Sequence, residues 1–529
     1  MRKQASGGRK PPGEIGRAQW LVLVAAFLGW MFDGLEMGLF PLVARPALRD
    51  LLQVTDDGKI GLWFGVITAG FLVGAATGGV LFGWLGDRLG RVRAMMLSVL
   101  TYAVFSGLCG IARTAEEVAA YRFIAALGMG GEWSLGVALV MEVWPDRSRG
   151  VMAGLIGAAS NVGFMLIAVI GLGLGMVIDT LADVLSVVGL PQPWNDELLA
   201  NSAWRLLMIV GAAPALLTLF IRWFVPESER WRYEQKQGAT SHWAAGDLLG
   251  VAVGAAGASL IIYLWVAELS VGVRVVGTVL GLGVATLGYL FPLIRYLQRI
   301  GAADVAASIA REAPLTLPSP AEGERGLMNA ATAWTSTVGR MLLGACLGGV
   351  ALIGTWGASQ WTPLWADQLA GDKIPEAKAL TQICSAIGAI VGTMLGALAG
   401  DWFGRRITYS VLCVGSLASA MLLYQVNHQF GPNFLASVFI VGMFTASFYG
   451  WLPLYLPELF RTRVRATAQG FSFNFGRILA AIGVLQTGNL MGIFEGSYPR
   501  ACSVVSLIYA VGLGLIWLAP ETKGRPLPE

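Results

Sequence analysis

Histidine and charge are both scarce in this sequence. Charged residues make up 13% of the 529 residues and hydrophobic residues 55%, so charge is too sparse to cover a soluble globule of this size. The only histidines, His242 and His428, fall in predicted loops and supply neither a metal cluster nor a Ser-His-Asp set. The five cysteines stand singly in or beside apolar runs, without metal-ligand or disulfide spacing. We therefore expect no enzyme and no cofactor or metal.

Other motifs are missing as well. The sequence has no Gly-x4-Gly-Lys-Ser/Thr phosphate loop, which argues against work driven by ATP. The net charge of +4 does not indicate a nucleic-acid partner, because the basic residues gather in turns between apolar runs. No cleavable signal is recognisable, since the first apolar run continues from about Trp20 to about Val43 and is long enough to span a membrane.

Long apolar runs fill the chain instead. Runs of about 20 residues predict fourteen membrane-spanning helices, six in each half and two between the halves. The predicted helices are 20–44, 61–84, 94–112, 117–142, 151–176, 204–225, 248–267, 275–294, 340–366, 378–399, 407–425, 432–456, 467–491 and 499–518. The expected fold class is an all-α membrane protein.

Composition divides the chain into four parts. These are a cytoplasmic N-terminal segment (1–19), a six-helix half (20–230), a central insert with two further helices (231–339) and a second six-helix half with a short tail (340–529). Within the insert, residues 311–326 are rich in proline and charge and are predicted to be a cytoplasmic linker.

The distribution of lysine and arginine predicts the orientation. Basic residues concentrate before the first helix and in alternate loops, whereas loop 177–203 carries four acidic residues and no basic one. By the positive-inside rule both termini are cytoplasmic. We expect a multi-pass protein of the plasma (inner) membrane, and a monomer.

The two halves repeat each other. Gly86-Asp87-Arg88-Leu89-Gly90-Arg91 recurs as Gly400-Asp401-Trp402-Phe403-Gly404-Arg405, and the pair Glu142 and Arg149 recurs at a similar interval as Glu458 and Arg465. An internal duplication of membrane helices is typical of secondary transporters, which bind their substrate between the repeats.

These turns resemble the signature that the major facilitator superfamily carries after helices 2 and 8. The superfamily's metabolite:proton symporters have a helix 4 pattern that is similar to Arg122, Gly128, Gly130, Gly131, Glu132 and Trp133, with Ala126 where glycine is usual. Pro226-Glu227-Ser228 and Pro520-Glu521-Thr522 look like sugar-porter motifs. Asp33-Gly34-Leu35-Glu36 resembles an element of organic-acid:proton symporters, and two extra central helices are a feature of the sialic acid:proton symporter family.

Ionisable residues inside predicted helices are the candidates for proton coupling, because a charge at bilayer depth is costly. Asp33 lies near mid-membrane, with Glu36 three residues later on the same face. Glu132 and Arg122 lie on helix 117–142, and the resemblance implies that both helices line a central cavity. Alternatively, Asp33 or Glu36 pairs with Arg122 and joins the two helices. With both histidines in loops, a carboxylate has to carry any coupled proton.

Arg477 is the candidate for binding an anionic substrate. A guanidinium group makes two charge-assisted hydrogen bonds to a carboxylate. Alternatively, Arg477 lies nearer the cytoplasmic end and pairs with Glu458 or Asp401. Further candidate substrate contacts are Asn474, Gln360, Trp361, Tyr449 and Asn161, although Trp and Tyr in such helices more often serve in packing.

The repeated turns are interpreted as gate elements at the cytoplasmic helix ends. Their arginines can reach the glutamates of the second motif, and such contacts hold one state of a transporter closed. The predicted gate residues are Asp87, Arg88, Arg91, Glu142, Arg149, Asp401, Arg405, Glu458 and Arg465. The alternative is that the basic residues only direct topology.

The resemblance implies a proton-coupled symporter in the lipid bilayer. It would import a small organic anion, such as sialic acid or a monocarboxylate, by alternating access. A sugar or polyol:proton symporter is the alternative, and a nutrient sensor without transport is an alternative of another class.

Overall fold

The computed structural model describes residues 16–528 except 55–56, 146–147, 188–190, 268, 312–319 and 375. Most of the predicted segment 1–19 therefore lies outside the described residues.

The first half forms a bundle of long helices. These are α1 (Arg17–Leu52), α2 (Asp57–Leu89), α3 (Arg91–Cys109), α4 (Ala115–Val143), α5 (Arg149–Val187), α6 (Gln192–Val210) and α7 (Ala215–Phe224). A short helix, α8 (Glu229–Lys236), and two 3-10 turns lead to the inserted pair, α9 (Leu248–Val266) and α10 (Val271–Arg311).

The second half repeats the bundle. It contains α11 (Pro320–Gly357), a 3-10 turn (Ser359–Trp361), α12 (Thr362–Ala370), α13 (Ala377–Phe403), α14 (Arg405–Val426), α15 (Pro432–Leu459), α16 (Arg465–Ile493), α17 (Tyr498–Ser506) and α18 (Ile508–Leu515). Equivalent glycines separate α2 from α3 in the first half and α13 from α14 in the second. Gly90 and Gly404 have φ angles of 110° and 97°, a region that side chains with a Cβ rarely enter.

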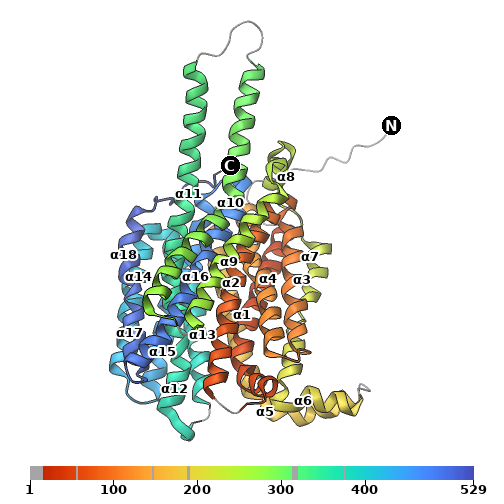
Figure 1. The fold of residues 1–529 in the computed structure, drawn as a ribbon, viewed down its shortest axis with the longest axis vertical. Coiled ribbons are helices and arrows are strands. Elements are labelled where there is room, and N and C mark those ends of the chain that lie inside the picture. Colours follow the sequence, from red (N-terminus) through yellow and green to blue (C-terminus); the bar gives the residue numbers. More distant parts are fainter. Residues whose placement is uncertain are drawn as a thin grey trace.

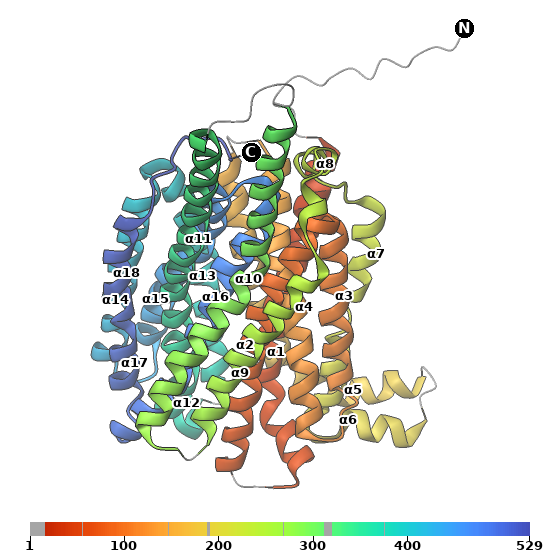
Figure 2. The same ribbon diagram turned by 45° about the horizontal axis from the view of Figure 1, so that its top comes forward.

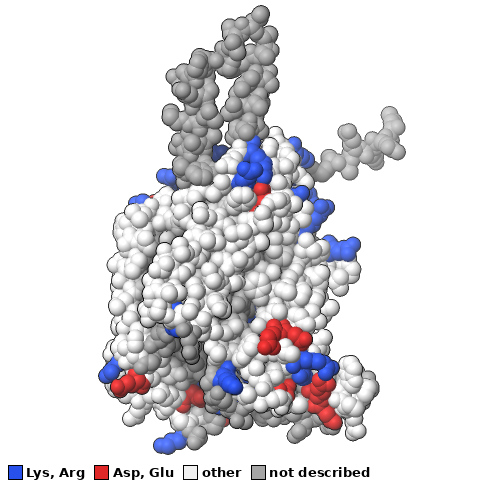
Figure 3. Space-filling model, in the orientation of Figure 1, with Lys and Arg blue, Asp and Glu red and all other residues white. Residues whose placement is uncertain are grey.

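The fold class predicted from the sequence is confirmed. Within the described residues, thirteen spans are long and apolar enough to cross a membrane. The remaining predicted helix, α16, has 29 residues but a more polar sequence. Figure 3 shows the charged side chains gathered toward the two ends of the molecule, with an uncharged band between them.

The two halves stand side by side, and the inserted pair lies across their front (Figures 1 and 2). The halves meet where α2 packs along α16 and α5 packs along α13. The first contact is close, because a Cβ on Gly470 would lie 2.2 Å from the carbonyl oxygen of Gly79. Small residues allow such close approach of membrane helices.

The inserted helices form a hairpin that packs on α2. Tyr289 of α10 and Thr77 of α2 share a buried hydrogen bond of 2.7 Å. At one end of the hairpin, Arg299 holds Asp247 through two bonds of 2.6 Å. Its outer face carries exposed aliphatic residues, including Val279 and Leu287. The hairpin therefore presents an apolar face suited to lipid and is attached to the first half.

The structure differs from the sequence-based expectations in the connections. Within loop 177–203, helix α5 continues to Val187 and α6 begins at Gln192. Of the predicted linker 311–326, residues 312–319 lie outside the described residues, and α11 already begins at Pro320. Proline fits the first turn of a helix, so it starts this helix rather than interrupting it. The expected boundary between residues 339 and 340 consequently falls inside α11.

Candidate functional site

A cavity lies between the two halves, and the empty space in it and at its opening to solvent is about 1110 Å³. It is lined by α1, α4 and α5 of the first half and by α11 to α16 of the second. Among the described residues that line it, two are charged, Asp33 and Arg477, and the others are neutral. Polar groups gather on the side of the second half, and they are Thr355, Ser359, Gln360, Thr362, Thr381, Gln382, Ser385 and Thr445.

Asp33 is fully buried in the middle of α1. Within the described part of the chain, neither of its carboxylate oxygens has a hydrogen-bond partner. The charges that act on it belong to Glu132, Arg477 and Glu36. Glu132 comes from α4, is also buried, and occupies the space that a side chain at Gly29 would need: a Cβ there would lie 1.6 Å from Oε1 of Glu132.

Arg477 faces the same cavity from α16. Its side chain is buried, and its Nη1 atom has no partner among the described residues. The guanidinium lies 5.7 Å from the ring centre of Phe473, which stacks on Trp133 at 3.8 Å. Among the charged groups around Arg477, Asp33 has the largest electrostatic effect on it. Arg477 is therefore positioned toward the cavity rather than toward the gate carboxylates.

Glu36 and Arg122 form a separate buried ion pair. The distance between Nη1 of Arg122 and Oε1 of Glu36 is 2.8 Å. The guanidinium also lies over the rings of Phe40 at 4.4 Å and Phe71 at 4.8 Å. Neither residue lines the cavity. The sequence left open whether Asp33 or Glu36 pairs with Arg122 and joins the two helices. In the structure Glu36 makes this pair and Asp33 does not.

The remaining predicted substrate contacts divide into two groups. Gln360, Tyr449 and Asn161 line the cavity. Asn474 instead donates to the carbonyl oxygen of Gly130 on α4 at 2.9 Å, and Trp361 packs beside Tyr498 with 6.2 Å between ring centres. Asn474 and Trp361 therefore contact neighbouring helices rather than the cavity. The sequence could not show this, because the residue type alone does not reveal which neighbour its side of the helix faces.

Sequence reasoning missed several lining residues. Thr381 and Ser385 are four residues apart and so share one face of α13. Trp30 lies three residues before Asp33 on α1 and also lines the cavity. Helical spacing from the predicted residues was the signal that could have found Trp30. On α13 the predicted gate residue Asp401 lies near the opposite end of the helix, so it gave no starting point for finding Thr381 and Ser385.

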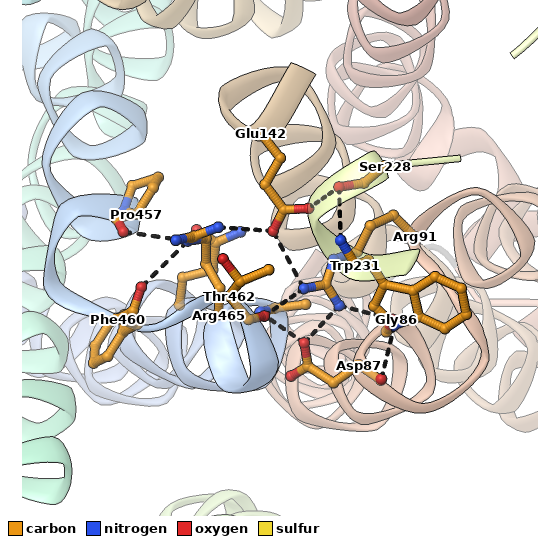
Figure 4. Close-up of polar contacts among 12 residues, drawn as sticks. Gly86, Asp87, Arg91, Glu142, Ser228, Trp231, Pro457, Phe460, Thr462 and Arg465 are labelled. Carbon is orange, nitrogen blue, oxygen red and sulfur yellow. Dashed lines mark hydrogen bonds and ion pairs between the residues drawn. The ribbon is translucent and has the colours of Figure 1, made fainter. Parts of the chain in front are cut away.

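A cluster of four charged residues joins the halves at one end of the bundle, and we call it the gate cluster (Figure 4). Arg91 contacts Asp87 at 2.6 Å and Glu142 at 3.2 Å. Arg465 of the second half contacts the same Glu142 oxygen at 2.9 Å. Asp87 also accepts hydrogen bonds from the backbone N–H and hydroxyl of Thr467 at the start of α16. Asp87 thus satisfies free N–H groups at a helix N-terminus across the interface.

The second half has an equivalent set, with a shorter arginine–glutamate contact and a longer arginine–aspartate contact. Arg405 contacts Glu458 at 2.5 Å and Asp401 at 3.7 Å. Arg149 of the first half is buried beside this set and acts electrostatically on Glu458. Arg88 differs from the other predicted gate residues, since its guanidinium lies over the ring of Trp84 at 5.0 Å.

The two Pro-Glu motifs also repeat in space. Glu227 accepts the backbone N–H groups of Arg91 and Val92 at 3.0 and 3.1 Å. Glu521 accepts those of Arg405 and Arg406 at the same two distances. Burial raises the pKa of Glu227, although these hydrogen bonds oppose the change. Partial burial also favours a higher pKa for Glu521. The backbone N–H groups that donate to its carboxylate have the larger combined effect, so its pKa is lowered.

The gate cluster and the cavity lie at different levels of the bundle. The cavity is lined by the end of α11 and the beginning of α13, whereas the gate cluster sits near the end of α2 and the beginning of α16. The halves are therefore fastened together at the gate-cluster end, with a cavity beyond it. This is the geometry expected of one state of an alternating-access bundle.

Two family models together match most of the chain. A model described as Sugar (and other) transporter matches residues 21–247, and one described as Major Facilitator Superfamily matches residues 230–484. A putative metabolite transport protein of Haemophilus influenzae is 25% identical over 96% of this chain and 98% of its own length. The cis,cis-muconate transport protein of Acinetobacter baylyi is 23% identical, with 94% and 95% covered. A solved structure of the proton:xylose symporter XylE superposes with a TM-score of 0.65 at 15% identity, over 96% of this chain and 98% of that chain.

Proposed function

Since this chain is a transporter of the major facilitator superfamily and not an enzyme, we propose that it is a proton-coupled symporter that imports a small organic anion. The observation that carries the proposal is the pair Asp33 and Arg477, one carboxylate and one guanidinium facing a single cavity between the halves. Burying both groups without a direct ion pair is costly, so a functional role explains their presence.

Each group has a distinct task in this proposal. Arg477 binds the substrate carboxylate through its planar guanidinium, which can donate two parallel hydrogen bonds. Asp33 takes up a proton when the cavity is open to one side and releases it when the cavity opens to the other. The gate cluster holds one entrance closed and separates when the halves rock. A relative named for cis,cis-muconate transport supports an organic acid as cargo.

The wall of the cavity suits a substrate with a flat or apolar body. Trp30, Phe164, Trp356, Tyr449 and Phe473 line it together with the neutral polar groups. Aromatic rings offer stacking surfaces to planar molecules. Aromatic acids and short monocarboxylates fit these apolar surfaces, whereas the hydroxyl groups of sialic acids would need the neutral polar groups of the lining. We propose this range of anions as the substrate class.

The sidedness of the molecule is part of the proposal. Basic residues of the gate-cluster end, such as Arg93 and Arg461, lie in exposed positions. The positive-inside rule then places this end and both termini in the cytoplasm of a plasma (inner) membrane. In that orientation the state described here is closed toward the cytoplasm.

Replacing Asp33 tests the proposal. We expect Asp33→Asn to abolish uphill uptake in proteoliposomes while anion exchange continues, because exchange needs no net proton movement. Exchange serves as the internal control for a folded protein. Normal uphill accumulation by the variant would contradict a role for Asp33 in coupling.

A sugar or polyol:proton symporter is the second candidate. It is favoured by the match of residues 21–247 to the sugar transporter model and by the neutral groups Gln360 and Gln382 in the cavity. A thermal-shift screen of the purified protein against sialic acids, lactate, benzoate and hexoses at two pH values separates the candidates. Stabilisation by hexoses alone would contradict the anion proposal, and counterflow in proteoliposomes would exclude a sensor that does not transport.

A further inference from the structure

The charges in and beside the cavity do not balance if every group is ionised. Arg477 is the only cation among the described lining residues. Two carboxylates stand against it, Asp33 in the lining and Glu132 next to it. Ionisation of all three groups would leave one uncompensated negative charge in the membrane interior, where charges are costly.

Within the part of the chain that the structure describes, no other nearby group supplies the missing positive charge. The cation closest along α4, Arg122, is engaged by Glu36 at 2.8 Å. Tyr102 of α3 is a neutral titratable group close to Asp33 and Glu132, and Tyr449 of α15 lies close to Arg477. Helix α5 contributes only neutral groups to this part of the lining.

The geometry of the two carboxyl groups agrees with a shared proton. All four oxygens of Asp33 and Glu132 are buried and without a hydrogen-bond partner in the described part of the chain. Glu132 reaches α1 at Gly29, which lies four residues before Asp33 and therefore on the same face of that helix. Two adjacent buried carboxylates cannot both be ionised, but one protonated and one ionised group attract each other through a short O–H···O bond.

We infer that Asp33 and Glu132 share one resident proton in the empty transporter, and that one further proton enters with each monoanionic substrate. This inference rests on the proposed function and specifies its stoichiometry. In the empty state the pair carries one negative charge, which Arg477 balances. In the loaded state the substrate carboxylate binds Arg477 and the pair holds two protons, so the site is again neutral. Release removes the anion and one proton, and the resident proton stays.

The charge balance also selects the substrate. A monoanion and one proton leave no net charge in the moving site, so the cycle is electroneutral. A dianion such as muconate, for which one relative is named, would leave one uncompensated charge in the loaded cavity unless one of its two carboxyl groups carries a proton. A neutral sugar would leave Arg477 without a partner once the pair is doubly protonated.

The resident proton can be observed without transport. We expect infrared spectra of the purified protein at neutral pH to show the C=O stretch of a buried protonated carboxyl group that shifts in heavy water. The band should vanish in Glu132→Gln and in Asp33→Asn, and persist in Glu132→Asp and in the control Asp247→Asn, which removes an ion-paired carboxylate elsewhere. Absence of the band from the wild type, or its survival in both neutral variants, would overturn the shared proton.

Proteoliposomes test the stoichiometry, with benzoate, lactate and N-acetylneuraminate as monoanion probes. We expect a pH gradient to drive their accumulation and an imposed potential of about 100 mV to change it less than about twofold, because one net charge per cycle would change it about 50-fold. A 50-fold response would overturn electroneutral coupling while leaving anion symport intact. If no probe accumulates with the pH gradient, the proposed function itself fails, and the stoichiometry fails with it.

Discussion

At Gly29 the absence of a side chain makes room for Glu132. A Cβ would lie 1.6 Å from Oε1 of Glu132, closer than any non-bonded contact allows. We expect Gly29→Ala to reduce uphill uptake, because the added Cβ displaces the carboxyl end of Glu132, and to change the unfolding temperature little, because the end of a flexible side chain can move aside. Gly70→Ala on α2 is the matched control, since its Cβ would meet no atom within 4 Å. Equal behaviour of the two variants would exclude a specific slot for Glu132.

The planar shape of Arg477 is a second property of a single residue with a measurable consequence. Lysine keeps the positive charge but cannot donate two parallel hydrogen bonds. We expect Arg477→Lys to weaken anion binding about tenfold or more, since a hydrogen bond between charged groups contributes about 1.5–3 kcal/mol. The apparent affinity in a counterflow assay measures this change. An unchanged affinity would mean that Arg477 does not touch the substrate.

Among the helix contacts, the gate cluster links α2, α3 and α4 of one half to α16 of the other. Removing one partner of a buried ion pair costs about 3–5 kcal/mol, so we expect Arg465→Met to shift the population away from the closed gate. Spin labels at the exposed positions Arg93 and Arg461 should report longer distances in this variant. Arg88→Met is the control, because Arg88 contacts Trp84 rather than the opposite half. Unchanged distances in Arg465→Met would show that other contacts close this end.

At the scale of the whole molecule, the inserted hairpin of α9 and α10 packs on the first half. Its buried hydrogen bond between Tyr289 and Thr77 fastens α10 to α2. We expect Tyr289→Phe to lower the free energy of unfolding by about 0.5–1.5 kcal/mol and to preserve transport, because the lost bond lies outside the cavity. Tyr263→Phe on the exposed face of α9 is the control and should change neither property. Loss of transport in Tyr289→Phe would assign the hairpin a direct part in the cycle.

Much of the fold and part of the site could be predicted from the sequence. An apolar run of about 20 residues satisfies its backbone polar groups only as a helix in lipid, so thirteen of the predicted helices follow from length and composition, and α16 is the more polar exception. The repeated Gly-Asp-x-x-Gly-Arg turns also predict a pair of equivalent helix ends. The connections were predicted less well, as Pro320 illustrates, because proline can either end a helix or begin one.

The sequence by itself predicted that Asp33 and Glu132 lie near mid-membrane, because their distance from the helix ends sets their level, whereas it left the level of Arg477 open. Only the tertiary structure decided which groups meet. Glu36 rather than Asp33 takes Arg122, and Asn474 bonds Gly130 instead of facing the cavity. The physical reason is that helical spacing fixes the relative directions of side chains on one helix, whereas the rotation of that helix against its neighbours depends on packing across the whole bundle.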